Sequence, residues 1–397
     1  MELEQFAEAE TACRTALAAN PDYAPALSNL GLILLQRDAY GEAEALLRRA
    51  VAIAPDLELS YGNLAIALQG AGRYDEAERI LRDLLLRFPD SLSARNNLAL
   101  SLLGSGQFAE AWPFFEARRF EPKLAAAYRR PEGMTRWSGE AAPGRIVRIQ
   151  AEQGFGDMIQ FCRYAPMVAA RARVLMEAPT PLLRLFRTLA GVERVIGPGE
   201  ATSSDLFCPI MSLPGVFGTL PDTIPAGVPY LSADPGQIGQ WRSRTAPLGG
   251  LKIGIAWSGS PSMRFDRHRS IDPTELAPLL STHNVSFVSL QKGGARYSHP
   301  NLADWTEALD DFADTAALIE ALDLVISVDT AVLHLAGALG KPVWLLNRYV
   351  PDWRWGLERE DSAWYPTLRQ FRQPSPGDWP SVLEQVARQL ARLVALG

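Results

Sequence analysis

Cysteine is scarce in this chain of 397 residues, which has only Cys13, Cys162 and Cys208. An odd and widely spaced set of cysteines excludes a disulfide framework and lacks zinc-site spacing. Long apolar runs are missing too, because no window approaches the roughly 18 uninterrupted apolar residues of a membrane-spanning helix. The first ten residues, MELEQFAEAE, are acidic and do not form the apolar core of a signal peptide. We therefore expect a cytoplasmic protein without a membrane span.

An excess of positive charge is also absent, since 39 Lys and Arg face 45 Asp and Glu, a net charge of −6. Phosphate backbones usually require a basic surface, so nucleic acid is not the expected partner. A local basic site for a diphosphate is still compatible with this balance. Apolar residues make up 47% of the chain and charged residues 21%, as in ordinary globular proteins. At about 100–200 residues per domain, the length suggests two or three compact units.

Three landmarks recur every 34 residues along the N-terminal third. They are a Pro-Asp pair, an Asn-Leu pair, and a Glu-Ala pair preceded two residues earlier by an aromatic residue. A 34-residue period is the signature of tetratricopeptide (TPR) repeats. The positions are Pro21, Pro55 and Pro89; Asn29, Asn63 and Asn97; Glu42, Glu76 and Glu110; and the aromatic residues Tyr40, Tyr74 and Phe108.

Each repeat is expected to hold two amphipathic helices, for example over residues 24–37 and 40–54, and the prolines mark helix starts. One pair of helices cannot bury its apolar face alone, so successive pairs stack. We predict one leading helix and three full repeats over residues 1–122. Such an array either offers a concave surface to a protein or peptide, or serves as a scaffold that caps the next domain or mediates self-association.

Strands alternate with helices after a connector over residues 123–144, which predicts parallel βαβ units. The first lobe, residues 145–235, has expected strands over 145–151, 174–177 and 194–196. A Gly/Pro-rich linker follows at 236–250. The second lobe, residues 251–397, has expected strands starting at Lys252 and over 285–291, 324–328 and 343–346. Its C-terminal helix, 381–396, is expected to pack back across the first lobe. Two facing Rossmann-like lobes would form the GT-B arrangement.

Ligands of open α/β sheets bind beyond the carboxyl ends of the strands, so the loops there are the candidate site. The loop over residues 152–157, EQGFGD, follows the first strand. Gly154 and Gly156 leave room for a ligand to approach the backbone, although the full G-x-G-x-x-G spacing of NAD-binding proteins is absent. Asp157 is either a general base for an acceptor hydroxyl or a helix cap.

Basic residues are concentrated in the loop after the first strand of the second lobe. Arginine donates hydrogen bonds in pairs and suits a diphosphate, although a solvated basic loop is the alternative. The next loop, SLQKGG, carries two further candidates for the nucleotide or phosphate, or is a plain turn. The predicted donor-binding residues of these two loops are Ser258, Arg264, Arg267, Arg269, Gln291 and Lys292.

A third loop of the second lobe, DTAVLH, opens a helix whose first amides suit phosphate. Its donor-binding candidates are Asp329, Thr330, Ala331 and His334, the last being either a ligand contact or a structural residue. Aromatic residues follow in YVPDWRWG. Tyr349, Trp353 and Trp355 either face a sugar or base or pack between lobes.

Five segments together resemble bacterial TPR-fused glycosyltransferases, which are related to the heptosyltransferase-like family 9 and, more distantly, to protein O-GlcNAc transferase. The segments are residues 152–166 (EQGFGDMIQFCRYAP), 266–271 (DRHRSI), 289–293 (SLQKG), 323–346 (DLVISVDTAVLHLAGALGKPVWLL) and 351–373 (PDWRWGLEREDSAWYPTLRQFRQ). The block over 323–346 is the most specific of them.

The resemblance implies a metal-independent, inverting GT-B glycosyltransferase that needs no cofactor, because the nucleotide-sugar is its co-substrate. It implies that Asp157 is the base, that Arg267 or Arg269 contacts donor phosphate, and that Asp329, Thr330 and His334 lie near the donor. The expected acceptor is a protein Ser or Thr hydroxyl, of flagellin type in some members, which the repeats recruit. The alternatives are an interaction protein with a degenerate nucleotide-binding domain and a transferase acting on lipopolysaccharide or another glycan.

Overall fold

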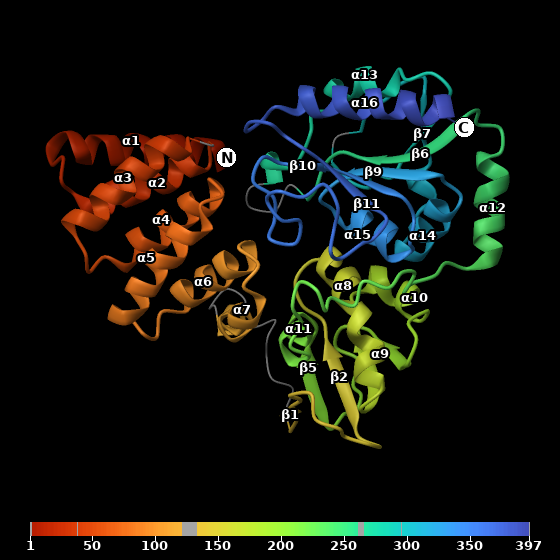
Figure 1. Ribbon diagram of the computed structural model, residues 1–397, viewed down its shortest axis with the longest axis horizontal. Coiled ribbons are helices and arrows are strands. Elements are labelled where there is room, and N and C mark those ends of the chain that lie inside the picture. The colour runs from red at the N-terminus through yellow and green to blue at the C-terminus, as the bar shows by residue number, and fades with distance from the viewer. Residues whose placement is uncertain (1, 38, 121–132, 261–265, 295, 397) are drawn as a thin grey trace. The chain divides into compact units, whose positions relative to one another are not determined.

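The computed structural model describes residues 2–37, 39–120, 133–260, 266–294 and 296–396 (Figure 1). The chain divides into two compact units. The first comprises Met1–Ala126 together with Asp352–Leu357, and the second comprises Ala127–Pro351 with Glu358–Gly397. Among the described residues, no helix is both long and apolar enough to span a bilayer.

The first unit is a stack of antiparallel helix pairs. The leading helix α1 (Glu2–Ala19) precedes three pairs, and a short 3-10 turn, Glu116–Phe120, follows the last pair. This confirms the predicted TPR array. The pairs are α2 (Ala24–Leu35) with α3 (Tyr40–Ile53), α4 (Glu58–Gly70) with α5 (Tyr74–Arg87), and α6 (Leu92–Gly104) with α7 (Phe108–Phe115).

The aromatic landmarks act as wedges between successive repeats. A Cβ atom added to Gly70 would overlap the ring of Tyr40, and one added to Gly104 would overlap the ring of Tyr74. Each ring therefore packs on bare backbone of the next repeat, which explains why aromatic residue and glycine recur together. The third landmark, Phe108, instead contacts Trp353 with ring centroids 5.7 Å apart.

Trp353 and Trp355 belong to this first unit, where they are core residues. Trp353 is 8% exposed and packs edge-on against Trp112 as well as Phe108, and Trp355 is 0% exposed. The guanidinium of Arg354 lies over the Trp353 ring. Our interpretation of these two tryptophans as sugar or base contacts is therefore wrong, because buried rings offer no face to a ligand.

The first lobe of the second unit is a five-stranded parallel sheet in the order β1-β5-β2-β3-β4. The helical segment between β2 and β3 consists of α8, a 3-10 turn and α9, and Pro166 lies in the first turn of α9, where its missing N–H costs nothing. The strands are β1 (Thr135–Arg136), β2 (Ile146–Gln150), β3 (Arg173–Glu177), β4 (Val192–Ile196) and β5 (Leu206–Pro209); the helices are α8 (Phe155–Phe161), α9 (Ala165–Ala169), α10 (Leu183–Phe186) and α11 (Leu213–Val216).

The second lobe is a six-stranded parallel sheet in the order β11-β10-β9-β6-β7-β8. Two parallel sheets with covering helices confirm the predicted fold class, a TPR solenoid followed by a GT-B-like pair of α/β lobes. The strands are β6 (Leu251–Ala256), β7 (Val285–Ser289), β8 (Leu302–Asp304), β9 (Leu324–Val328), β10 (Val343–Asn347) and β11 (Leu368–Arg372); the helices are α13 (Ala277–Leu280), α14 (Phe312–Glu320), α15 (Ala331–Ala338) and α16 (Trp379–Leu396).

The C-terminal helix α16 differs from expectation. Its apolar residues, among them Trp379, Val386 and Leu390, join the core of the second lobe with Ile253 and Phe287. Figure 1 shows α16 beside α13 on that lobe. The predicted packing across the first lobe is thus wrong, since the apolar stripe of α16 is buried on its own lobe.

The segment expected to be a linker between the lobes contains helix α12 (Pro235–Thr245). The side chain of Asp234 caps it by accepting a hydrogen bond from the Gln237 N–H at 2.9 Å, and Pro235 occupies the first turn, where proline is tolerated. Much of the Gly/Pro-rich stretch is therefore helical.

Candidate functional site

The carboxyl ends of β9, β6 and β7 lie side by side because these strands are neighbours in a parallel sheet. Ser258 follows β6, Gln291 follows β7, and Asp329 follows β9. The structure therefore brings the three predicted donor-binding loops to one edge of the second lobe. This edge, formed by the loops after β6, β7 and β9 together with the start of α15, is called the donor edge below.

Arg269 is anchored at the donor edge by two hydrogen bonds. Its Nε donates to Asp266 Oδ1 at 2.8 Å, and its Nη1 donates to the carbonyl oxygen of Asp329 at 2.8 Å. A Cβ on Gly259 would overlap the ends of the Asp266 and Arg269 side chains, so a larger residue there would displace this ion pair. Arg264 and the side chain of Arg267 lie outside what the structure describes. Arg269 is thus the predicted arginine that can be placed.

The side chains of Gln291 and Lys292 both make hydrogen bonds to backbone groups near the donor edge. Gln291 Oε1 accepts hydrogen bonds from the N–H groups of Trp257 at 3.0 Å and Ser258 at 2.9 Å. The Lys292 ammonium donates to the carbonyl oxygen of Leu309. The Gln291 side chain thus holds the backbone at Ser258 in place, and direct contact of Gln291 or Lys292 with a ligand stays a prediction.

Helix α15 begins at the donor edge without a side-chain cap. Thr330, its N-cap residue, has an extended backbone, and its hydroxyl lies 3.1 Å from Ser327 Oγ. First-turn N–H groups of a helix have no partner within the helix and carry partial positive charge. The backbone at Thr330 and Ala331 therefore suits an anionic group, as predicted from the sequence.

His334 is a buried link, which favours the structural interpretation over exposed ligand contact. The residue is 5% exposed. Its Nδ1 lies 2.9 Å from the Tyr365 hydroxyl, and its Nε2 lies 3.6 Å from Asp329 Oδ1. The imidazole thus lies between Asp329, just before the N-cap of α15, and Tyr365, near the start of β11.

Asp157 occupies the third position of α8, where its Oδ2 accepts a hydrogen bond from the Gly154 N–H at 3.1 Å. The cap that we considered is therefore present. A carboxylate has further acceptor positions, so the role as a base stays a prediction. Gln153, which precedes the N-cap residue Gly154, has φ = 61°. This left-handed conformation costs a non-glycine residue about 1–3 kcal/mol.

Gly156 serves a different purpose from the one predicted. A Cβ on this glycine would lie 2.9 Å from His334 Cδ2. The missing side chain therefore lets α8 of the first lobe approach α15 of the second, rather than making room for a ligand. Phe155 beside it packs edge-on against Phe312 of α14, with ring centroids 5.3 Å apart.

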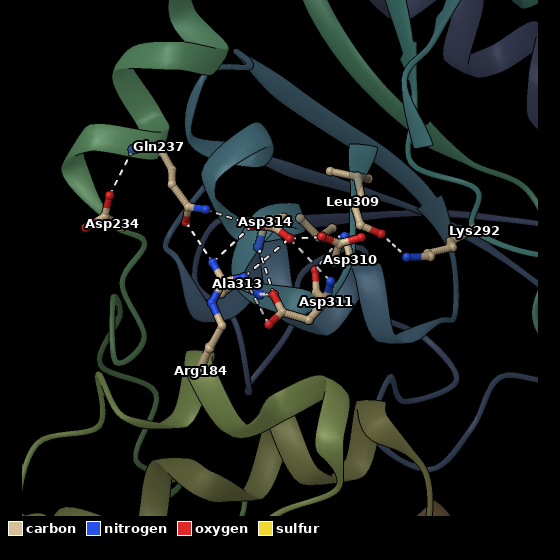
Figure 2. A network of polar contacts seen from close by, with 10 residues as sticks. Arg184, Asp234, Gln237, Lys292, Leu309, Asp310, Asp311, Ala313 and Asp314 are labelled. Atoms are coloured by element: carbon tan, nitrogen blue, oxygen red, sulfur yellow. Dashed lines mark hydrogen bonds and ion pairs between the residues drawn. The ribbon is translucent and has the colours of Figure 1, made fainter. Parts of the chain in front are cut away.

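A polar network around Asp314 joins the two lobes and α12 (Figure 2). The Asp314 carboxylate accepts hydrogen bonds from Arg184 of α10 at 3.0 Å and from Gln237 of α12 at 2.8 Å. It also accepts the N–H groups of Asp310 at 3.0 Å and Asp311 at 3.4 Å. Burial alone would raise the pKa of Asp314, but these donors outweigh it and hold the pKa below its ordinary value.

We expect Asp314→Asn to destabilise the second unit by about 1–2 kcal/mol at neutral pH, because a buried charge-assisted network is lost. A lowered pKa means that the charged carboxylate stabilises the fold above the pKa of the unfolded chain, about 3.9. This contribution is lost as the pH falls through the folded-state pKa. The denaturation midpoints of variant and wild type should therefore converge below about pH 4. Asp310→Asn is the matched control, because only the Asp310 backbone enters the network; a constant difference at all pH values would contradict this account.

Tyr349 is the remaining aromatic candidate for a sugar or base. It follows β10 and is 42% exposed, and its N–H donates to Gln373 Oε1 at 3.1 Å. Residues that we did not assign a role, namely Arg163, Tyr230 and Tyr365, form buried contacts next to His334. An arginine inside the apolar stretch QFCRYAP was the one sequence signal that pointed to them.

Two family models match the chain. The tetratricopeptide repeat model matches residues 1–58 and 63–122, and the glycosyltransferase family 9 (heptosyltransferase) model matches residues 310–362. The second match contains α14, β9, α15 and β10, and of the donor edge it contains the loop after β9 and the start of α15. The repeats and the heptosyltransferase-like domain that we predicted are confirmed.

Protein FlbA of Caulobacter vibrioides is 30% identical over 320 residues, which are 72% of this chain and 52% of that protein. The chain thus spans about half the length of this relative. A glycosyl transferase family 9 structure from Veillonella parvula is 10% identical, with 64% of this chain and 98% of that one covered and a TM-score of 0.44. E. coli ADP-heptose LPS heptosyltransferase II is 15% identical, with 64% and 99% covered and a TM-score of 0.44.

Proposed function

We propose that this chain, which joins tetratricopeptide repeats to a heptosyltransferase-like domain of glycosyltransferase family 9, transfers a sugar from a nucleotide-activated donor to a protein Ser or Thr hydroxyl. The observation that carries the proposal is the donor edge. Anchored Arg269 and the uncapped start of α15 meet there, within or beside the segment that matches the transferase family.

The chemistry at this edge suits a diphosphate leaving group. In sugar transfer the bond between the sugar and the diphosphate breaks, and negative charge builds up on the departing phosphate. Helix-start amides and a guanidinium stabilise such charge without rearranging. Ser258, which Gln291 positions, adds a hydroxyl at the same edge. Metal independence belongs to this proposal, with these groups supplying the positive charge.

Asp157 is the proposed general base. It would accept the proton of the acceptor hydroxyl as that oxygen attacks the anomeric carbon, which inverts the configuration in a single displacement. Its place on α8 supports the assignment, because α8 packs directly against α15 at Gly156 and His334. Acceptor base and donor phosphate site would then approach the same sugar from the two lobes.

The acceptor assignment rests on the repeats. Stacked TPR units offer an extended surface for a protein or peptide, and we propose that they recruit the acceptor; the cytoplasm is the proposed compartment. A lipopolysaccharide or other glycan acceptor is the competing outcome. Protein FlbA itself is named without an activity, so it does not decide between them.

The first test is a thermal-shift screen of the full chain against UDP-, GDP-, ADP- and CMP-sugars. A ligand that binds only the folded state stabilises it by about 2.7 kcal/mol when present at 100 times its Kd, and this raises the apparent Tm. We expect one nucleotide class to stabilise the protein, and we expect transfer of its sugar to Ser or Thr of a protein acceptor. Binding without transfer to any protein or glycan acceptor would instead indicate a nucleotide-binding interaction protein.

A further inference from the structure

Charged residues are distributed unevenly between the two helices of each repeat. The first helices of the pairs, α2, α4 and α6, contain one acidic residue, Glu58, and one basic residue, Arg95. Both are engaged by the turn between α5 and α6, since Glu58 accepts a hydrogen bond from the Ser91 hydroxyl and Arg95 donates to the Pro89 carbonyl oxygen at 2.7 Å. The first helices therefore offer almost no charge to a partner.

Helix α1 and the second helices of the pairs carry most of the helical charge of the array, and this charge joins successive repeats. Arg48 of α3 pairs with Glu44 of the same helix at 2.8 Å and with Glu76 of α5 at 3.0 Å. The pattern recurs 34 residues later, where Arg82 of α5 pairs with Glu110 of α7 at 2.8 Å. Charge on this row of helices thus supports the stacking of the repeats.

The first helices lie on the inner side of the stack. Helix α2 contacts α4, and α4 contacts α6, whereas the second helices α3 and α5 approach each other less closely. The inner helices of a curved stack are closer together than the outer ones. We therefore place α2, α4 and α6 along the concave surface that stacked repeats form.

The solvent-facing residues of these helices form a stripe in a common register. Three aliphatic residues, each 34 positions from the next, are half-buried along it: Leu32, Ile66 and Leu100. On the same helix faces, at the three- and seven-residue spacings that bring side chains together, Asn29 of α2 is exposed and Leu59 of α4 is 51% exposed. These five residues are called the inner stripe below. Its surface is aliphatic carbon and a carboxamide, without a charged member.

We propose that the inner stripe docks an uncharged, aliphatic segment of the acceptor protein. Leucine and isoleucine side chains gain free energy when apolar carbon covers them. A lysine or glutamate of the partner would lose hydration at the stripe without meeting an opposite charge there, which disfavours a charged segment. The identity of the partner as the acceptor rests on the proposed function, whereas the preference of the stripe for uncharged segments does not.

The test is the selection of random peptides, displayed on phage, by the full chain. Peptides of about 12 residues extend over about 40 Å, enough to contact several helices at once. We expect the selected peptides to be enriched in Leu, Ile and Val. We also expect them to contain Asp, Glu, Lys and Arg at about half the frequency of the unselected library or less.

Two variants place charges of opposite sign on the inner stripe. Asn29→Asp is isosteric, and Leu59→Lys adds an ammonium group at an exposed position, so both proteins should keep the wild-type Tm. Asn29→Asp should shift the selected peptides toward Lys and Arg, and Leu59→Lys should shift them toward Asp and Glu, because opposite charges across an interface attract.

The matched controls make the same two changes outside the inner stripe. Asn20 is exposed at the end of α1, and its side-chain oxygen accepts a hydrogen bond from the Asp22 N–H, which an aspartate can also accept. Leu86 is 82% exposed on α5, a second helix. Asn20→Asp and Leu86→Lys should therefore select the same peptides as the wild type.

Several results would overturn the proposal. The wild type could select charged peptides or no peptides, or both stripe variants could select the same peptides as the wild type. A change of molecular mass in sedimentation analysis of Leu59→Lys, without a change in peptide selection, would show that a second copy of this chain occupies the inner stripe.

Acceptor affinity provides an independent measurement. We expect Leu59→Lys to raise the KM for the protein acceptor about tenfold, with little change in kcat or in the KM for the nucleotide-sugar. If the wild type transfers no sugar, the proposed function fails while the peptide preference still stands. If the wild type transfers sugar to a protein and Leu59→Lys leaves the acceptor KM unchanged, the docking role of the inner stripe fails alone.

Discussion

Asp157→Asn should lower kcat by about 10²–10⁴-fold while leaving the stability of the protein almost unchanged, if Asp157 is the general base. The asparagine side-chain oxygen can still accept the hydrogen bond from the Gly154 N–H that Asp157 accepts at 3.1 Å. The cap of α8 is therefore kept. The amide cannot take up a proton, so the acceptor hydroxyl is no longer activated. The measurement is the turnover rate at saturating donor and acceptor, together with the apparent Tm.

Two further variants separate the base from the cap. Asp157→Ala removes both functions, so it should lose turnover and also about 0.5–2 kcal/mol of stability. Asp314→Asn makes the same chemical change in the corresponding position of α14, where Asp314 forms a capping box with Asp311. It should cost stability and leave most of the turnover. Wild-type kcat in Asp157→Asn would show that Asp157 only caps the helix.

The repeats and most strands could be predicted because their signals are local. Tyr40, Tyr74 and Phe108 mark a period that a single repeat already contains. The strands β2, β6 and β9 are apolar runs that stand out from their neighbours. By contrast, β1 has two residues and becomes a strand only by pairing with β5. A segment this short acquires its structure from a partner distant in the sequence, which no local pattern reveals.

The site was predicted less completely for the same reason. Loops at strand ends can be located from topology, so Ser258, Gln291 and Asp329 were expected together and are neighbours. Which polar atoms remain for a ligand depends on tertiary partners. Gln291 braces the backbone at Ser258, and His334 pairs with a tyrosine 31 residues away. The prediction for Trp353 was wrong because the sequence cannot distinguish a tryptophan that contacts a sugar from one that packs against the last helix of a repeat array.

Arg269→Ala should weaken binding of the nucleotide-sugar about 10- to 100-fold, which corresponds to losing one charge-assisted contact with phosphate. Among the described residues, hydrogen bonds engage its Nε with Asp266 and its Nη1 with Asp329. An arginine has five N–H donors, so donors remain for a phosphate oxygen. Arg269→Lys keeps the charge but not the planar fork, and we expect an intermediate loss. Isothermal titration calorimetry with the donor gives the affinities.

The arginine also supports the donor edge, so its contact with phosphate must be separated from its structural contribution. Removing it leaves the Asp266 carboxylate, whose side chain is 12% exposed, without its ion pair. A collapse of the loop would weaken the binding of every ligand at this edge, including a nucleoside that lacks phosphate. Loss of a phosphate contact would instead weaken binding of the nucleoside diphosphate and of its sugar conjugate far more than binding of the nucleoside. We therefore expect Arg269→Ala to lower the affinity for the nucleoside diphosphate more than the affinity for the nucleoside. Equal losses of both affinities would show that Arg269 only holds the loop in place. Asp266→Asn completes the comparison, because it weakens the brace while leaving the guanidinium in place.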